Sequence, residues 1–273
     1  MSYNKTISVL GCGWLGLPLA SYLFTKGYSV KGSTTSPLKI NLMKERGLES
    51  FILELNPEIS GNESARFFNS EILIINIPPP RGENAVQFHS DQIYSIMKAA
   101  KHSGLRKLVF ISSTSVYGNV NREVFEDEDS IPDTKSGLAL KSVERLLISN
   151  PDFKTTIIRF GGLVGPGRNI SNFYSEGSKI KSPNSPVNLI HLDDCIGIIY
   201  QVIKENCWNE IFNAAAPIHP MRREIYAAAA LKAEKPQPEF DYDFSESYKI
   251  INPTKLISKL KYSFIHSDPL EFS

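Results

Sequence analysis

The chain has 273 residues, of which 41% are hydrophobic and 22% are charged. This composition supports a large buried core and excludes wholesale disorder. Lys and Arg total 30 against 29 Asp and Glu, for a formal charge of +1. Because no excess of positive charge and no basic cluster is present, we expect neither nucleic acid nor an anionic membrane as a partner.

The cysteine pattern and the hydropathy point to an intracellular protein. Cys12, Cys195 and Cys207 are widely spaced and odd in number, so they predict neither a disulfide framework nor a paired metal site. The first residues lack the apolar stretch of a secretory signal, and no apolar run approaches the ~18 residues that span a bilayer. We therefore expect a cytoplasmic location and reduced thiols.

The first half of the chain alternates short apolar strands with amphipathic helical segments. The expected strands are residues 6–10, 28–31, 51–55, 71–77, 107–112 and 155–160. Continuous apolar strands separated by helices predict a parallel sheet that is covered on both faces. The predicted fold class is therefore α/β, with a doubly wound Rossmann-type sheet whose ligand lies at the carboxyl ends of the strands.

A glycine-rich turn, GCGWLG at residues 11–16, directly follows the first strand and precedes a helical pattern. In that context Gly11 permits a sharp turn, Gly13 lets the main chain approach a pyrophosphate, and Gly16 allows close helix–strand contact. The phosphates would lie at a helix N-terminus. The alternative is a tight structural turn without a ligand. The predicted NAD(P) contacts are Gly11, Cys12, Gly13, Trp14, Leu15 and Gly16.

The stretch after the second strand favours NADP over NAD. An NAD site usually places Asp or Glu about 20 residues past the glycines to hold the ribose 2′-hydroxyl. Here residues 32–39 read GSTTSPLK, and the first acid after Gly16 is Glu45. Hydroxyls and Lys39 accept a 2′-phosphate, so we predict contacts from Thr34, Thr35 and Ser36. The alternative is an ordinary Ser/Thr turn and helix cap.

The amino-acid composition changes after Gly161, and this change suggests a division into domains. Residues 161–186 are rich in Gly, Ser, Asn and Pro and are interpreted as loop, before a strand at 187–192. A further helix and a strand at 210–214 then return to the main sheet. We predict an NAD(P)-binding Rossmann domain of residues 1–165 with 187–215, and a small C-terminal substrate-binding lobe of residues 166–186 and 216–273.

Five later segments occur in an informative order: SSTSVYG at 112–118, KSVE at 141–144, RFGGLVGPGR at 159–168, IHLDD at 190–194 and IFN at 211–213. Together they resemble the motifs of the extended short-chain dehydrogenase/reductases, which include the NAD-dependent epimerase/dehydratases. The resemblance covers nearly the whole chain. It implies an NAD(P)-dependent oxidoreductase or epimerase/dehydratase-like enzyme that acts on a carbonyl or sugar-nucleotide type of small molecule.

The resemblance also implies roles for individual residues. Ser113 occupies the position that hydrogen-bonds the substrate oxygen, and the alternative is that it only lines the cofactor pocket. Lys141 occupies the position that holds the nicotinamide ribose, and the alternative is a solvated helix lysine. Further cofactor contacts are implied at three strand ends, at Asn76, Ile77, Pro78, Ser112, Phe160, Gly161 and Gly162.

One catalytic position departs from this family. A Tyr that exchanges a proton with the substrate should stand four residues before Lys141, and this chain has Gly137 there. No tyrosine occurs in residues 131–149, and we interpret Tyr117 as a packing residue. The chain thus resembles a subgroup without the catalytic Tyr. Two functions stay open, an enzyme with a non-standard active site and a non-catalytic NAD(P)-binding redox sensor or regulatory module.

Three further features have competing interpretations. The segment HLDD at 191–194 offers metal-ligating groups, but we interpret its acids as stabilising the start of the next helix and expect no metal. Arg159, Arg168, Arg222 and Arg223 are explained equally well as ligands for an anionic substrate and as solvated surface. By analogy with the family, a homodimer would pair through the helices that contain Ile93 and Val143.

Overall fold

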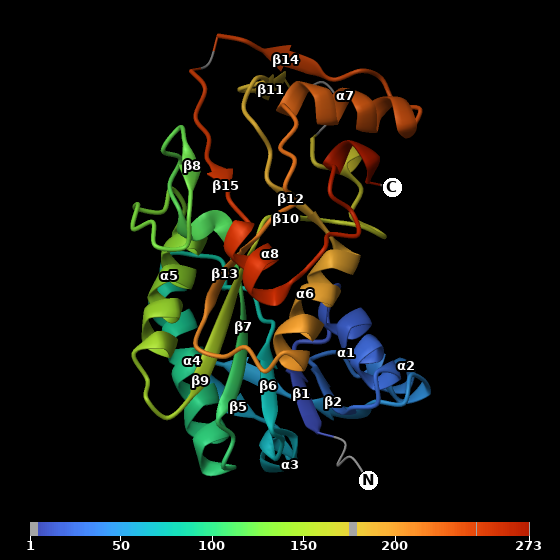
Figure 1. Ribbon diagram of the computed structural model, residues 1–273. Coiled ribbons are helices and arrows are strands. Elements are labelled where there is room, and N and C mark those ends of the chain that lie inside the picture. Colours follow the sequence, from blue (N-terminus) through green and yellow to red (C-terminus); the bar gives the residue numbers. More distant parts are fainter. Residues whose placement is uncertain (1–4, 175–178, 244, 273) are drawn as a thin grey trace.

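The computed structural model describes residues 5–174, 179–243 and 245–272. Seven parallel strands form the central sheet, in the order β13-β9-β7-β6-β1-β2-β3 (Figure 1). Their bounds are β1 Thr6–Leu10, β2 Ser29–Thr34, β3 Glu49–Ile52, β6 Ile72–Ile75, β7 Lys107–Ser113, β9 Lys154–Phe160 and β13 Ile211–Ala214. This architecture confirms the predicted doubly wound α/β fold, including the late strand that returns to the sheet.

Helices cover both faces of the sheet because its strands are apolar on both faces. Ile7 and Val9 of β1 pack into one core and Leu10 into the other. The first core includes residues of α1 (Gly16–Thr25), α2 (Lys39–Glu45), α6 (Leu192–Lys204) and α8 (Thr254–Leu260). The second includes residues of α3 (Ser64–Phe68), α4 (Ala85–His102) and α5 (Lys135–Ile148). Alternate residues of each strand thus support opposite layers of helices.

The strand order reverses between β1 and β6. Residue Leu10 of β1 pairs with Ile75 of β6, so the chain leaves both strands at the same edge of the sheet. The residues that follow, Gly11 and Asn76, are therefore neighbours in space. In open α/β sheets this switch point is where a crevice opens for a ligand.

Two predictions about secondary structure were wrong in detail. The expected strand 51–55 divides, because β3 ends at Ile52 and β4 (Glu54–Asn56) pairs antiparallel with β5 (Glu58–Ser60) across a turn at Pro57. The expected loop at 161–186 contains β10 (Gly162–Val164), which pairs with β12 (Leu189–His191), and β11 (Lys179–Lys181). The partners of β10 and β11 lie far along the chain, so local composition did not indicate these strands.

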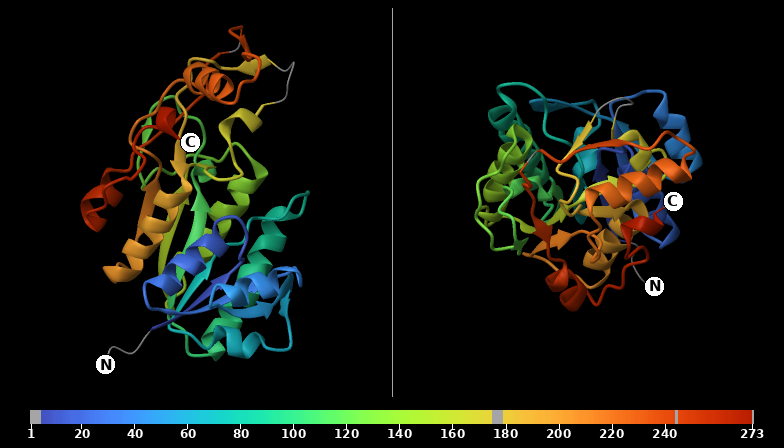
Figure 2. Two further views of the ribbon diagram at one scale, coloured as in Figure 1. Left: turned by 90° about the vertical axis from the view of Figure 1, so that its right-hand side faces the viewer. Right: turned by 90° about the horizontal axis from the view of Figure 1, so that it is seen from above.

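A small lobe lies beyond the carboxyl ends of the sheet (Figure 2). It contains α7 (Arg222–Lys232), β14 (Glu239–Asp241) paired with β11, and two single-turn helices, η2 (Ile170–Asn172) and η3 (Pro269–Glu271). Its core is separate and consists of Val164, Ile170, Leu189, Ala216, Ile225 and Phe272. Below it, β8 (Glu123–Val124) pairs with β15 (Ile250–Ile251). The division into domains, and the role of the lobe in binding substrate, stay predictions.

The described part of the chain contains no helix that combines the length and the apolarity needed to cross a bilayer.

Candidate cofactor and substrate site

Two adjoining cavities lie at the switch point. The first, of about 340 Å³, reaches from the glycine turn to the end of β2. The second, of about 370 Å³, reaches from the same turn to the end of β7 and the loop after β10. Both are lined by Gly13, Asn76, Ile77 and Pro78. The two cavities therefore form one groove that passes over the glycine turn.

The three glycines of the turn differ in whether neighbouring atoms leave space for a side chain. Gly11 has a φ of +98°, and a Cβ there would lie 2.5 Å from the Asn76 carbonyl oxygen. A Cβ on Gly16 would lie 2.1 Å from the Gly11 carbonyl oxygen. The fold itself therefore demands glycine at both positions. At Gly13 an added Cβ would meet nothing within 4 Å, so no packing contact of the described residues requires glycine there.

The main-chain amides of residues 11–13 have acceptors, and that of Gly13 donates to the Gly11 carbonyl oxygen at 2.9 Å. Those of Gly11 and Cys12 donate to the Oγ and the carbonyl oxygen of Ser33, at 3.1 and 2.8 Å. The amides of residues 14–16, at the start of α1, have no hydrogen-bond acceptor among the described residues. Unpaired amides at a helix N-terminus attract anions. The turn therefore presents a local anion site to the groove.

Asn76 holds the turn in place. Its Nδ2 donates to the Gly11 carbonyl oxygen at 2.9 Å, and the residue lines both cavities. Cys12 lies inside the turn and is 2% exposed. Burial raises the pKa of the Cys12 thiol to about 12, so this cysteine is not a reactive thiolate at neutral pH.

The first cavity carries hydroxyls and one cation. Ser33, Thr34, Thr35 and Lys39 line it, and its described walls contain no Asp or Glu. Ser36 does not line this cavity; its amide donates to Thr34 Oγ1 at 3.1 Å. The sequence prediction placed Ser33 in the stretch after the second strand without naming it as a contact, whereas β2 continues to Thr34 and brings Ser33 against the glycine turn. In a site without carboxylates, no negative charge repels an additional phosphate.

Two adjacent serines at the end of β7 line the second cavity and differ in their hydrogen bonding. The Ser112 hydroxyl donates to the Glu144 carboxylate at 2.6 Å, so it presents lone pairs to the cavity. The Ser113 hydroxyl accepts from the Ser115 amide at 3.1 Å and keeps its hydrogen for another acceptor. The pair therefore offers one acceptor and one donor to a bound molecule.

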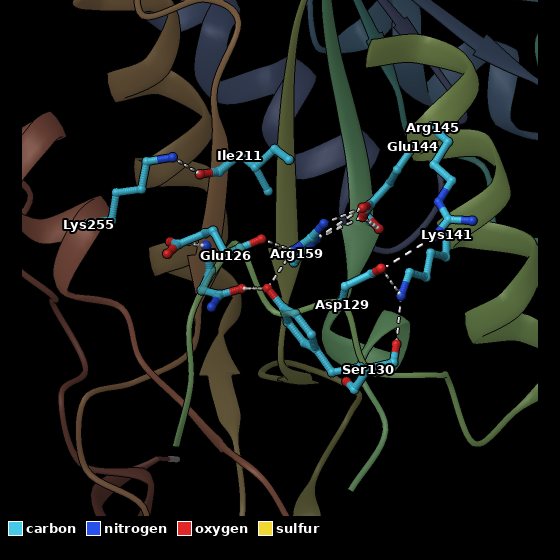
Figure 3. Close-up of polar contacts among 12 residues, drawn as sticks. Glu126, Asp129, Ser130, Lys141, Glu144, Arg145, Arg159, Ile211 and Lys255 are labelled. Atoms are coloured by element: carbon cyan, nitrogen blue, oxygen red, sulfur yellow. Dashed lines mark hydrogen bonds and ion pairs between the residues drawn. The ribbon is translucent and has the colours of Figure 1, made fainter. Parts of the chain in front are cut away.

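Lys141 points away from the second cavity. Its Nζ donates to the Ser130 carbonyl oxygen at 2.6 Å and pairs with Asp129 at 2.8 Å (Figure 3), which lowers the pKa of the Asp129 carboxyl. Leu140 lines the cavity instead. Successive residues of a helix point about 100° apart, so Lys141 projects from a different side of α5 than Leu140 does. This placement does not support the prediction that Lys141 holds the nicotinamide ribose.

A buried ionic network lies beneath the serines. Arg159 donates to both carboxylate oxygens of Glu144 at 2.6 to 3.1 Å, and also to the Glu126 carbonyl oxygen and the Tyr117 hydroxyl (Figure 3). Tyr117 in turn donates to Asn213 at 2.7 Å. Burial raises the pKa of Tyr117 to about 12. Tyr117 is therefore a packing and hydrogen-bonding residue at neutral pH, as we interpreted it from the sequence.

Besides Ser36 and Lys141, four predicted cofactor contacts line neither cavity: Gly16, Phe160, Gly161 and Gly162. Phe160 is 2% exposed within the core. A Cβ on Gly161 would lie 2.7 Å from the Asn188 carbonyl oxygen, and one on Gly162 would lie 2.8 Å from Leu189. These glycines therefore permit close packing of β12. The cavity residues that sequence reasoning missed include Gln92, Ile111, Leu140 and Leu163, most of which read as ordinary core positions.

The acids at the start of α6 act mainly on the fold. Asp194 is fully buried and accepts hydrogen bonds from the Tyr262 hydroxyl and from the amides of Ile265 and His266. Asp193 lies with His191 and His266 in a cluster whose ligand atoms are within 4.8 Å of one another. Sequence reasoning missed His266 because it lies more than 70 residues from His191.

The comparisons with known proteins agree with this geometry. The chain is 32% identical over 270 residues to Protein YeeZ of Escherichia coli (strain K12), covering 97% of this chain and 98% of that protein. No protein-family model matches the chain. A short-chain dehydrogenase/reductase superfamily protein from Agrobacterium tumefaciens with bound NAD superposes with a TM-score of 0.78, at 17% identity over 95% of this chain and 92% of that one.

A second solved structure is UDP-glucose 4-epimerase from Thermotoga maritima with UDP-glucose. It superposes with a TM-score of 0.75, at 18% identity, over 95% of this chain and 94% of that chain. At such identities the likeness shows the fold. The chain therefore belongs to the family of Protein YeeZ, and its fold is that of the short-chain dehydrogenase/reductase and NAD-dependent epimerase/dehydratase proteins.

Proposed function

We propose that this chain binds NAD(P) along the groove and acts as an NAD(P)-dependent enzyme of the epimerase/dehydratase type on a small molecule with a carbonyl or sugar-nucleotide group. The observation that carries the proposal is Gly13, which no packing contact of the described residues requires and which lies where both cavities meet. A pyrophosphate seated on the free amides of residues 14–16 would explain the missing side chain.

We propose NADP as the preferred cofactor. Thr34, Thr35 and Lys39 would surround the 2′-phosphate in the first cavity, where no carboxylate of the described walls repels it. A bound nicotinamide would supply or accept a hydride in the second cavity. Ser113 would donate its free hydrogen to a carbonyl oxygen, while Ser112 would accept from a hydroxyl group of substrate or ribose.

The proposed active site is non-standard because it contains neither a Tyr at position 137 nor a Lys facing the cavity. No described residue that lines the second cavity is an Asp, Glu, His, Lys or Tyr. The proton that accompanies hydride transfer would therefore pass between the substrate oxygen and solvent, with Ser113 orienting that oxygen. Such a site favours substrates that need little general acid catalysis.

The alternative function is a non-catalytic redox sensor. It is favoured by the apolar wall of the second cavity, which is formed by Ile111, Leu140 and Leu163. Such a wall offers no counter-charge and stabilises the neutral reduced nicotinamide over its cationic oxidised form. A sensor would then bind NADPH more tightly than NADP⁺ and turn over no substrate.

Turnover tests the enzyme directly. The protein is screened with NADPH against carbonyl compounds, by absorbance at 340 nm, and with NADP⁺ against nucleotide sugars, by product analysis for redox-neutral epimerisation. We expect turnover of at least one class, and a Ser113→Ala variant should be about tenfold slower or more, because one hydrogen bond to the reacting oxygen is lost. If no compound of the panel is turned over but NADPH binds tightly, the result would favour the sensor. If the protein binds no nicotinamide dinucleotide, the result would exclude both the enzyme and the sensor.

We also propose a cytoplasmic location and a homodimer through α4 and α5. These helices lie side by side on one face of the sheet (Figure 1), and they expose Tyr94, Leu138 and Ile148. Light scattering on the purified protein should give about twice the chain mass, and a Tyr94→Glu variant should shift it toward the monomer. A monomeric wild-type protein would contradict the proposed dimer.

A further inference from the structure

We propose that Arg168 anchors an anionic group of the substrate, a phosphoryl or carboxylate group, at the nicotinamide end of the groove. The inference rests on the proposed function and names the class of substrate that the same site takes. Arg168 lines the second cavity together with Ser112 and Ser113. A single molecule bound there would present its reacting oxygen to the serines and its negative charge to the guanidinium.

The main chain holds Arg168 in a defined place. It closes the turn after β10, where the Arg168 amide donates to the Gly165 carbonyl oxygen at 2.8 Å. Gly165, at a φ of +147°, packs on Trp14, since an added Cβ would lie 3.4 Å from the indole ring. The turn therefore lies directly against the start of α1, and its position is linked to that of the glycine turn.

The guanidinium is oriented by an aromatic ring. Its Cζ lies 4.4 Å from the centre of the Trp14 ring, and Trp14 is itself fixed because its Nε1 donates to the Pro166 carbonyl oxygen at 2.7 Å. A guanidinium that stacks on a ring uses its face, so the N–H groups at its edge stay free for a planar or tetrahedral anion. Arg168 is exposed, but its guanidinium has a fixed aromatic partner.

Charge supports the same assignment. Among the residues that the structure describes, no acidic side chain forms an ion pair with Arg168, and its side chain donates no hydrogen bond. The buried Arg159, in contrast, is saturated by Glu144. The described walls of the second cavity also lack Asp and Glu. A bound anion would therefore meet one available cation and no repelling carboxylate.

A phosphate of the cofactor is the other anion in reach of this turn. The free amides of residues 14–16 already provide acceptor-seeking groups for the cofactor pyrophosphate, and Trp14 and Leu15 line the second cavity together with Arg168. Arg168 is absent from the walls of the first cavity, where the adenine half of the cofactor is proposed to lie. Because those amides already serve the pyrophosphate, we assign Arg168 to a substrate anion, and one experiment separates the two sources.

Trp14 provides the signal for that experiment. The chain has two tryptophans, and Trp208 lines neither cavity, so a Trp208→Phe variant leaves Trp14 as the only indole. This variant, saturated with NADP⁺, is titrated with inorganic pyrophosphate, oxalate and UDP-glucose while Trp14 fluorescence is recorded. We expect a saturable change with at least one probe. Adding Arg168→Gln should weaken that binding about tenfold or more, and change the affinity for NADP⁺ less than threefold.

Arg106→Gln is the matched control, because Arg106 is exposed between α4 and β7. This substitution changes the net charge by the same amount as Arg168→Gln. It should bind the probe like the parent. The proposal is overturned if no probe binds the cofactor-loaded parent, if Arg168→Gln binds the probe equally well, or if it weakens NADP⁺ as much as the probe. If the parent binds no nicotinamide dinucleotide, the proposed function itself fails, and this proposal fails with it.

Discussion

Gly137 packs directly on the main chain of Ser115: an added Cβ at position 137 would lie 2.1 Å from the Ser115 carbonyl oxygen. This contact holds the first turn of α5 against η1 (Thr114–Val116), the short helix that follows the serine pair. In the resemblance to extended short-chain dehydrogenase/reductases, position 137 is where the proton-transferring Tyr should stand. The close approach of the two segments leaves no room for any side chain there.

Substituting Gly137→Ala should therefore destabilise the protein by about 1–3 kcal/mol, because the new methyl group forces two backbone segments apart. Lys135→Ala is the control, since Lys135 is exposed in the same turn of α5, and it should change stability by less than about 1 kcal/mol. Urea unfolding measures both. A Gly137→Ala protein as stable as wild type would contradict the packing described here, and Gly137→Tyr should not create activity.

The buried pair of Arg159 and Glu144 should be a major determinant of stability. Their side chains are 8% and 2% exposed, so Glu144→Gln leaves a desolvated guanidinium without its counter-charge. Removing one partner of such a pair costs about 3–5 kcal/mol. Glu205→Gln, at an exposed pair with Lys204, should cost less than about 0.5 kcal/mol. Equal unfolding free energies for the two variants would argue against the buried network.

Selectivity between the two cofactors should depend on Lys39. A Lys39→Ala variant loses a cation beside the proposed 2′-phosphate, so its affinity for NADP should fall about tenfold while its affinity for NAD changes less than twofold. Lys44→Ala, on the same helix and outside the first cavity, should bind both cofactors like wild type. Calorimetric titration gives the four constants. Equal losses for NAD and NADP in Lys39→Ala would place Lys39 away from that phosphate.

Three histidines should make the protein sensitive to mild acid. Burial lowers the pKa of His89, His191 and His219 below the ordinary value of 6.5. As the pH falls below 6.5, the unfolded chain therefore binds more protons than the native protein does. The free energy of unfolding is highest above that pH and decreases as the pH falls through the pKa values of the native histidines. We expect a loss of about 1–3 kcal/mol between pH 7.5 and 5.5.

The contribution of His89 can be isolated because its side chain is fully buried. Urea unfolding of His89→Gln at both pH values should show a loss smaller by about 1 kcal/mol than that of wild type. His102→Gln, at the exposed end of α4, should show the wild-type loss. The linkage is refuted if all three proteins lose the same stability or if wild type loses none.

Much of the framework was predictable from the sequence because it depends on local pattern. The apolar runs predicted the sheet strands, and β1 matches its expected bounds at Thr6 and Leu10. The glycine turn was predictable because its three glycines follow a strand directly. Ser113, which ends β7 and lines the second cavity, was singled out by the resemblance to the extended short-chain dehydrogenase/reductases.

The rotation of α5 could not be predicted in this way. Leu140 and Lys141 are adjacent, and both fit an amphipathic pattern, so local sequence does not decide which one faces the sheet. The contact of Glu144 with Arg159, on a strand that comes later in the chain, fixes the rotation and turns Lys141 toward Asp129. The partnership of His191 with His266 escaped prediction for the same reason, because tertiary contacts alone bring them together.

The central claim is that the groove over the glycine turn holds a dinucleotide, and Gly13→Ala tests it most directly. Because nothing described lies within 4 Å of the added methyl group, the unfolding free energy should stay within about 1 kcal/mol of wild type. Wild type should bind NADP with a dissociation constant on the order of micromolar, and Gly13→Ala should bind at least about thirtyfold more weakly. Equal affinity in the two proteins, or no binding of NADP or NAD by wild type, would contradict the account.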